Sequence, residues 1–162
     1  MNKLRIAGIV KESVVDGSGL RYVIFTQGCP HRCVGCHNPG THDFAGGYEI
    51  SITELLNSIL ETKLICGITF SGGEPFIQAE ACTVLSKLVK QSRDEFNIVA
   101  YSGYYYADLL LMAQKNRGIE EFLQSIDILI DGTYDVTQKA YDLPFRGSSN
   151  QSIIDLALLR SS

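Results

Sequence analysis

The stretch Arg21-Tyr-Val-Ile-Phe-Thr26 is followed almost at once by Gly28-Cys29-Pro30-His31-Arg32-Cys33-Val34-Gly35-Cys36-His37-Asn38-Pro39. The first six residues are β-branched and aromatic, a composition typical of a buried strand. The glycines and prolines that follow, up to about residue 47, mark a loop. The order predicts a strand that delivers three cysteines into one loop at its carboxyl end.

The same order of strand, loop and helix recurs along the chain. Further strands, each followed by glycine or by serine and glycine, are predicted at residues 67–71, 96–101 and 125–131. Helices are predicted at residues 51–62, which open on a capping box, and at 78–91 and 105–115. Residues 152–159 fit a strand or a helix. Parallel strands joined by crossover helices give this order, and such sheets carry their sites at the carboxyl ends of the strands.

The length limits how the sheet can close. A chain of 162 residues suits a single domain, residues 1–162. A complete eight-unit barrel takes about 250 residues. We therefore expect an α/β fold that is a partial, open (β/α) barrel with a curved, mostly parallel sheet.

Composition narrows the class of partner. The chain is 45% hydrophobic and 20% charged, with a net charge of −4, which argues against a dedicated nucleic-acid binder. Its first ten residues lack the sustained apolar core of a secretory signal. No apolar run approaches the roughly 20 residues that span a bilayer. We expect a cytoplasmic protein that binds neither nucleic acid nor membrane.

Three of the five cysteines, Cys29, Cys33 and Cys36, have the spacing C-x3-C-x2-C. Clustered thiols in a reducing compartment indicate a metal or redox site, and thiolates suit both zinc and iron–sulfur clusters. A zinc site would close with a fourth ligand such as His37 or His42. A three-thiolate cluster instead leaves one iron open. The spacing favours iron–sulfur and leaves zinc as an alternative.

The remaining two cysteines, Cys66 and Cys82, each stand alone in an apolar setting. We expect both to be small buried side chains.

Four segments together resemble the radical S-adenosylmethionine family. They are residues 15–21, the cysteine loop at 28–39, Ser71-Gly-Gly-Glu-Pro75 and Arg146-Gly-Ser-Ser-Asn-Gln151. Within that family the short length and the last segment are similar to the enzymes that activate anaerobic ribonucleoside-triphosphate reductase. The matching segments extend over most of the chain.

The resemblance implies a cofactor and a reaction. Cys29, Cys33 and Cys36 would hold a 4Fe-4S cluster whose open iron binds S-adenosylmethionine. One electron, from a flavodoxin-like donor, would cleave S-adenosylmethionine and leave a 5′-deoxyadenosyl radical. That radical would take a hydrogen atom from a glycine of anaerobic ribonucleoside-triphosphate reductase. The rival interpretations are another radical enzyme of the same family and a non-catalytic zinc-binding module.

The turn at residues 71–75 is the first candidate contact for S-adenosylmethionine. Gly72 and Gly73 let the backbone approach a ligand, and Glu74 would support the ammonium group of the cofactor. A simple tight turn is the alternative.

Other candidate contacts flank the cluster or end the fourth predicted strand. Gly35, Cys36 and His37 lie beside the last cluster ligand, with His37 expected to act through its backbone or as a hydrogen-bonding neighbour of the cluster. Gly35 stands where many family members have an aromatic residue near adenine, so another group must line that wall. Asp131 is a candidate that could equally be a turn or cap residue.

Two polar features have no single interpretation. Asp16 and Arg21 flank two glycines and would form a salt bridge or contact the site directly. The segment 146–151 is a candidate for contact with the cofactor or the partner.

Overall fold

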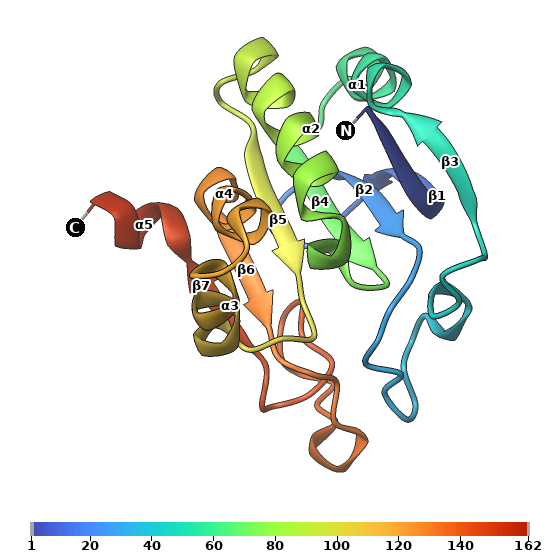
Figure 1. The fold of residues 1–162 in the computed structure, drawn as a ribbon, viewed down its shortest axis with the longest axis vertical. Helices are drawn as coiled ribbons and strands as arrows, with labels where there is room; N and C mark the ends of the chain where they lie inside the picture. The colour runs from blue at the N-terminus through green and yellow to red at the C-terminus, as the bar shows by residue number, and fades with distance from the viewer. Residues whose placement is uncertain (1, 162) are drawn as a thin grey trace.

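The computed structural model describes residues 2–161, which fold around one seven-stranded sheet (Figure 1). Along the sheet the strands lie in the order β3-β1-β2-β4-β5-β6-β7. Their bounds are β1 Lys3–Ser13, β2 Arg21–Thr26, β3 Tyr48–Ser51, β4 Gly67–Gly72, β5 Asn97–Tyr101, β6 Ile128–Asp131 and β7 Ser152–Asp155.

The centre of the sheet is parallel and both of its edges are antiparallel. Strands β2, β4, β5 and β6 run side by side in parallel register. β1 and β3 add antiparallel strands on one side, and β7 adds one on the other. The first and last strands of this order do not pair, so the sheet stays open. The prediction of an α/β fold with an open, mostly parallel sheet is confirmed.

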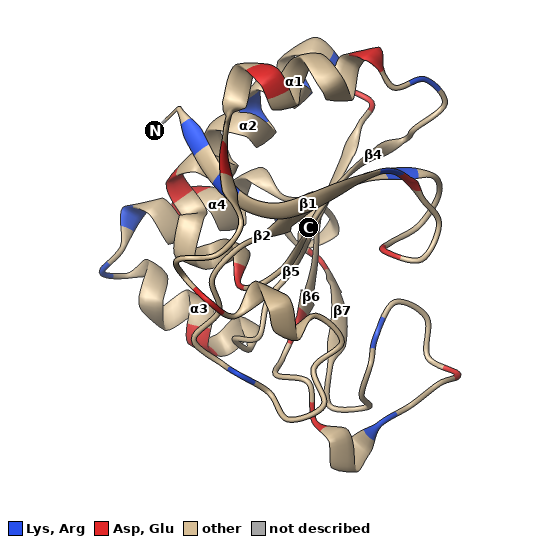
Figure 2. Cartoon of the chain, turned by 90° about the vertical axis from the view of Figure 1, so that its right-hand side faces the viewer, with Lys and Arg blue, Asp and Glu red and all other residues tan. Residues whose placement is uncertain are grey.

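Four helices cover one face of the sheet, as Figure 2 shows from the side. They are α1 Ile52–Glu61, α2 Ala79–Ser92, α3 Tyr106–Ala113 and α4 Arg117–Ser125. A short α5, Leu156–Ser161, follows β7. The segment 152–159, which fitted a strand or a helix, is therefore a strand followed by a helix.

Local signals account for the helix starts. Ser51 Oγ accepts a hydrogen bond from the Glu54 backbone N–H, which is the expected cap of α1. Asn116 caps α4 in the same way through Ile119. The sequence did not predict α4, and its last residue, Ser125, is the residue at which the fourth strand was expected to begin. That strand starts three residues later, at Ile128.

The pleat gives the sheet two different faces. Tyr22, Ile24, Phe70 and Ile98 belong to the apolar core on the helix side. The alternate residues point to the other face and include Arg21 and the polar residues Thr69 and Ser71. The loop at residues 14–20 folds back over this second face, where the Asp16 carbonyl accepts a hydrogen bond from Thr69 Oγ1.

Arg21 is 1% exposed, and its side chain holds the loop at residues 14–20 against the sheet. Its guanidinium donates to Thr69 Oγ1 at 2.7 Å and to the carbonyls of Ser18, Ile68 and Asn97 at 2.6–2.9 Å. Burial lowers the pKa of Arg21. The salt bridge considered between Arg21 and Asp16 is absent from the ion pairs of residues 2–161, because backbone carbonyls compensate the buried charge instead.

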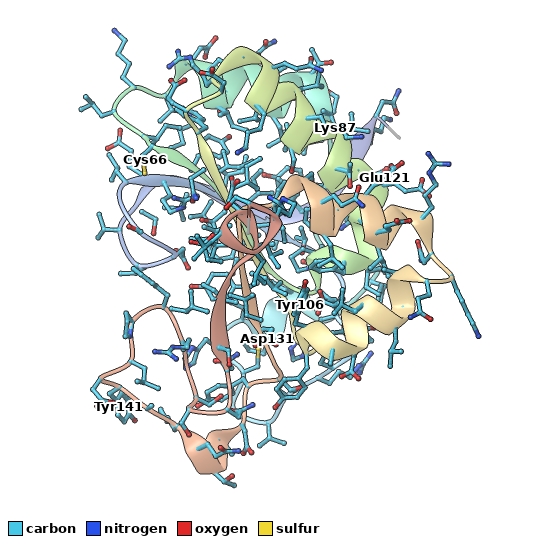
Figure 3. All side chains as sticks on the ribbon, turned by 90° about the vertical axis from the view of Figure 1, so that its left-hand side faces the viewer. Cys66, Lys87, Tyr106, Glu121, Asp131 and Tyr141 are labelled. Atoms are coloured by element: carbon cyan, nitrogen blue, oxygen red, sulfur yellow. The ribbon has the colours of Figure 1, made fainter. Side chains whose placement is uncertain are left out.

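The two isolated cysteines differ. Cys82 is fully buried, as expected, and burial raises the pKa of its thiol. The prediction for Cys66 is wrong: its side chain is exposed at the turn before β4 (Figure 3). The turn places its thiol beside the loop at residues 14–20, where it donates to the Ser18 carbonyl at 3.5 Å.

Within residues 2–161, none of the helices has the length and apolar character needed to cross a membrane.

Candidate functional site

A cavity of about 400 Å³ opens at the carboxyl ends of the parallel strands. That volume is within the roughly 300–1,000 Å³ of small-molecule sites. Its walls come from the cysteine loop, the turn after β4, the ends of β5 and β6, and the segment before β7. The principal lining residues are Cys29, His31, Cys33, Cys36, His37, Ser71, Gly72, Gly73, Tyr101, Ser102, Gly103, Gly132, Tyr134, Phe145, Arg146, Gly147 and Gln151.

The three cysteines of the C-x3-C-x2-C motif all line this cavity. Cys29 is buried, whereas Cys33 and Cys36 are half-buried. Burial raises the pKa of the Cys29 and Cys33 thiols. Such thiols need a metal centre to hold them as thiolates.

Backbone hydrogen bonds fix the loop that carries the cysteines. The Gly28 N–H donates to the Thr41 carbonyl at 2.7 Å, and the Cys29 N–H donates to the His42 carbonyl at 3.2 Å. The Gln27 side chain donates to two further loop carbonyls, those of Gly40 and Asp43. Hydrogen bonds within the protein therefore hold the cysteine loop in this conformation.

Among residues 2–161, the side chains around the cysteine loop do not form the closed four-ligand group of a structural zinc site. Among residues 2–161, no three His, Cys, Asp or Glu side chains are grouped closely enough to hold one metal ion. A structural zinc site needs four ligands converging on one ion, and His37 and His42 do not complete such a group. The three thiolates of a cluster bind different irons and stand farther apart. Cys29, Cys33 and Cys36 all line one cavity, where each could bind one iron of a cluster.

The turn after β4 is packed so closely that only glycine fits. Gly72 has φ +97°, and a Cβ there would lie 2.7 Å from the backbone of Thr26. A Cβ on Gly73 would overlap the Gly28 carbonyl. The Gly73 N–H donates to the Thr26 carbonyl at 2.8 Å. The two glycines therefore bring bare backbone to the cavity beside the cysteine loop.

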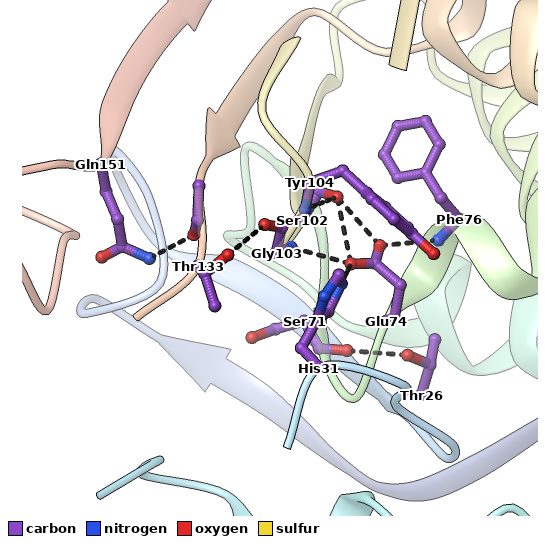
Figure 4. Close-up of polar contacts among 11 residues, drawn as sticks. Thr26, His31, Ser71, Glu74, Phe76, Ser102, Gly103, Tyr104, Thr133 and Gln151 are labelled. Atoms are coloured by element: carbon purple, nitrogen blue, oxygen red, sulfur yellow. Dashed lines mark hydrogen bonds and ion pairs between the residues drawn. The ribbon is translucent and has the colours of Figure 1, made fainter. Parts of the chain in front are cut away.

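Glu74 lies behind this wall and is fully buried (Figure 4). Its carboxylate accepts from the Gly103 N–H at 2.7 Å, from the Phe76 N–H at 3.1 Å and from Ser102 Oγ at 3.0 Å. It also contacts His31 Nε2 at 2.7 Å. His31 belongs to the cysteine loop, so Glu74 ties that loop to the ends of β4 and β5. Glu74 does not itself line the cavity.

His37 and Gly35 lie against a residue that the sequence did not single out, Tyr134. The His37 and Tyr134 rings are 5.0 Å apart, and both residues line the cavity. Gly35 has φ +74°, and a Cβ there would lie 3.6 Å from the Tyr134 ring. An aromatic ring thus stands next to the position where Gly35 lacks one. The sequence signal that could have identified Tyr134 is its position just after the end of β6.

Asp131 ends β6 and is buried behind the cavity rather than on its wall. Its carboxylate accepts from the Tyr106 N–H at 2.8 Å and from the Ser152 N–H at 3.1 Å. The first contact caps the start of α3, where Figure 3 shows Asp131 near Tyr106, and the second holds the first residue of β7.

The segment 146–151 closes the far side of the cavity. The Gln151 side chain accepts from the Gly147 and Ser148 N–H groups and donates to the Gly132 carbonyl at 2.9 Å (Figure 4). Arg146, Gly147 and Gln151 line the cavity. Asp16, from the loop at residues 14–20, also lines it.

Comparisons with known proteins agree with this site. The family described as 4Fe-4S single cluster domain matches residues 15–154. The pyruvate formate-lyase-activating enzyme of Clostridium pasteurianum is 34% identical over 151 residues, covering 76% of this chain and 63% of its own length. The anaerobic ribonucleoside-triphosphate reductase-activating protein of Haemophilus influenzae is 30% identical over 146 residues, covering 86% and 90%.

The chain therefore belongs to the 4Fe-4S single cluster domain family, on the branch of the radical S-adenosylmethionine activating enzymes. The resemblance seen in the sequence is confirmed at this level. The chain spans less than two thirds (63%) of the Clostridium relative's length and 90% of the Haemophilus relative's.

Proposed function

We propose that this protein cleaves S-adenosylmethionine reductively at a 4Fe-4S cluster and makes a glycyl radical on anaerobic ribonucleoside-triphosphate reductase. Cys29, Cys33 and Cys36 would be the ligands of the cluster. The cluster supplies the electron that breaks the sulfur–carbon bond of S-adenosylmethionine. A flavodoxin-like protein is the proposed electron donor, and the cytoplasm the proposed compartment.

The observation that carries this proposal is that the three cysteines and the Gly72–Gly73 turn face one cavity. The bare backbone of the turn can bind the ammonium group of the cofactor, beside an iron that no fourth cysteine takes. Tyr134 and His37 offer ring surface for adenine. Glu74 holds the turn and the cysteine loop in register from behind.

The openness of the sheet supports a protein substrate. Within residues 2–161, β3 and β7 are unpaired at their outer edges, and no strand closes the barrel between them. The glycine that gives up its hydrogen atom is part of the partner's backbone. A loop of the partner must therefore enter the site to bring that glycine to the radical. The reductase is the favoured partner because its activating protein from Haemophilus matches over 90% of its length.

Pyruvate formate-lyase is the second candidate target. The Clostridium relative has the higher identity, 34%, although this chain spans only 63% of it. The two targets share the chemistry and differ in the surface that must dock.

The test is hydrogen-atom transfer to each candidate. The protein is reconstituted with iron and sulfide, reduced without oxygen, and mixed with S-adenosylmethionine and either the reductase or pyruvate formate-lyase. Electron paramagnetic resonance should show a glycyl doublet in the reductase, and none when Cys36→Ala replaces the native chain. A doublet only in pyruvate formate-lyase would change the target, and none in either would refute the activase proposal.

A further inference from the structure

Arg146 lines the cavity, and within residues 2–161 its guanidinium forms no ion pair. We infer that it binds a carboxylate that enters the cavity. The inference rests on the proposed function, because that function brings two carboxylate sources to this site. One is the methionine part of S-adenosylmethionine, and the other is an acidic group of the inserted partner loop.

The hydrogen bonding of Arg146 is incomplete. Its Nε is buried and has no hydrogen-bond partner. Its Nη1 makes one long contact, 3.5 Å, to the Gln151 carbonyl. A guanidinium carries five donors in a fixed fork, and leaving a buried donor unpaired is costly. Arg21, by contrast, has three backbone carbonyls and a hydroxyl within 2.9 Å.

In the described part of the chain, no carboxylate pairs with Arg146. The ion pairs among residues 2–161 do not include it. Asp16 lines the same cavity, but its carboxylate accepts from Ser13 Oγ at 2.8 Å. Among the described residues that line the cavity, Arg146 is the sole lysine or arginine. An incoming anion therefore meets one permanent cation.

The backbone on both sides of Arg146 is held in place. Before it, the Phe145 carbonyl accepts from Tyr101 Oη at 2.8 Å, with Phe145 at φ +61°. After it, the Gly147 N–H donates to Gln151 Oε1 at 2.9 Å. Gln151 is in turn fixed to the Gly132 carbonyl. This pre-organised backbone lowers the entropy cost of binding a carboxylate.

A carboxylate matches the guanidinium fork, which can hold both oxygens at once. Gly147, the next residue, lies near the His37 ring, and His37 follows Cys36. Arg146 thus belongs to the stretch of wall that meets the cysteine loop. That position favours the carboxylate of S-adenosylmethionine, because it enters beside the cluster.

The test compares the native protein with Arg146→Gln and Arg146→Lys, all reconstituted anaerobically and matched for iron content and thermal unfolding. Equilibrium dialysis measures the affinity for S-adenosylmethionine and for decarboxylated S-adenosylmethionine. Calorimetry measures the affinity for the reductase. Lys139→Gln is the matched control, because Lys139 is an exposed cation on the same excursion between β6 and β7 and does not line the cavity.

We expect Arg146→Gln to weaken S-adenosylmethionine binding by about ten- to a hundredfold, with partial recovery in Arg146→Lys. The decarboxylated analogue should bind the native chain and Arg146→Gln equally, and Lys139→Gln should change neither. Unchanged S-adenosylmethionine binding with weaker reductase binding would assign the carboxylate to the partner. If Arg146→Gln binds both S-adenosylmethionine and the reductase as tightly as the native chain does, the inference alone is overturned. A native protein that binds no S-adenosylmethionine overturns the proposed function, and this inference with it.

Discussion

Two walls of the same cavity treat a charged side chain in opposite ways. The Glu74 wall, residues 71–76 and 102–104, surrounds its carboxylate with two backbone N–H groups, a hydroxyl and an imidazole. The Arg146 wall, residues 145–151, secures its backbone but leaves the guanidinium Nε without a partner. A buried charge with all its hydrogen bonds made holds the fold together, whereas a buried donor left unpaired beside a cavity points to a ligand.

The comparison also refines what Glu74 does. The sequence suggested that this residue supports the ammonium group of the cofactor. In the structure its two oxygens are engaged by four partners, and three of these, His31, Ser102 and Gly103, stand between Glu74 and the cavity that they line. The contacts favour a positioning role, with the backbone of Gly72 and Gly73 left to meet the ligand.

The largest effect should come from breaking the Glu74 wall. Glu74→Ala leaves the Gly103 and Phe76 N–H groups and the Ser102 hydroxyl buried without an acceptor. We expect it to lower the free energy of unfolding by about 3–5 kcal/mol, as for other buried charges that lose a partner. Urea unfolding of the cluster-free protein measures this.

Glu121→Ala is the control for that substitution. Glu121 forms an exposed pair with Arg117 on α4 and should cost under about 1 kcal/mol. Equal losses in the two variants would mean that the Glu74 network contributes no special stability.

A smaller effect is expected at the turn in front of Glu74. In Gly73→Ala the new methyl group meets the Gly28 carbonyl, so the turn and the cysteine loop must separate. Overpacking of this kind costs about 1–3 kcal/mol, and dialysis should show weaker S-adenosylmethionine binding. Gly40→Ala, where a Cβ has open space, should bind as the native chain does. Native affinity in Gly73→Ala would refute close contact at this turn.

The Arg146 wall should respond to loss of a single anchor. Tyr101→Phe removes the hydroxyl that holds the Phe145 carbonyl, at a cost of about 0.5–1.5 kcal/mol. Limited proteolysis between residues 139 and 147 should accelerate. Tyr22→Phe is the matched control, because Tyr22 donates its hydroxyl to Ser58 on the opposite face of the sheet. Equal protection of this segment in both variants would contradict the anchoring role.

The smallest effect should be at the exposed thiol. Cys66→Ala lies outside both walls and should change the free energy of unfolding by at most about 0.5 kcal/mol. Its iron content after reconstitution should equal that of the native chain. Loss of iron in this variant would show that Cys66, and not only the loop cysteines, serves the cluster.

Local sequence signals were enough for the central fold. β-branched runs marked the parallel strands, and Ser51 with Glu54 marked the start of α1. β1 escaped prediction because only Leu4 and Ile6 in it are deeply buried apolar residues. α4 escaped because Asn116-Arg-Gly118 has the composition of a turn.

The sequence predicted the parts of the site whose residues lie within one segment. It missed the parts that depend on contacts between distant segments. The cysteine spacing and the Gly72–Gly73 pair act within one segment. The partners of Glu74 lie 28 and 29 residues farther along, at Ser102 and Gly103. The placement of Arg146 depends on Tyr101, 44 residues from the carbonyl that it holds. No periodicity in the chain reports such pairings.

The most direct test of the central claim is the electron paramagnetic resonance spectrum of the reduced, anaerobically reconstituted protein, with and without S-adenosylmethionine. We predict four irons and matching sulfide per chain, a cluster signal that shifts when S-adenosylmethionine binds, and loss of both iron and signal in Cys36→Ala. An iron-free protein, or a cluster signal that S-adenosylmethionine leaves unchanged, would contradict the account.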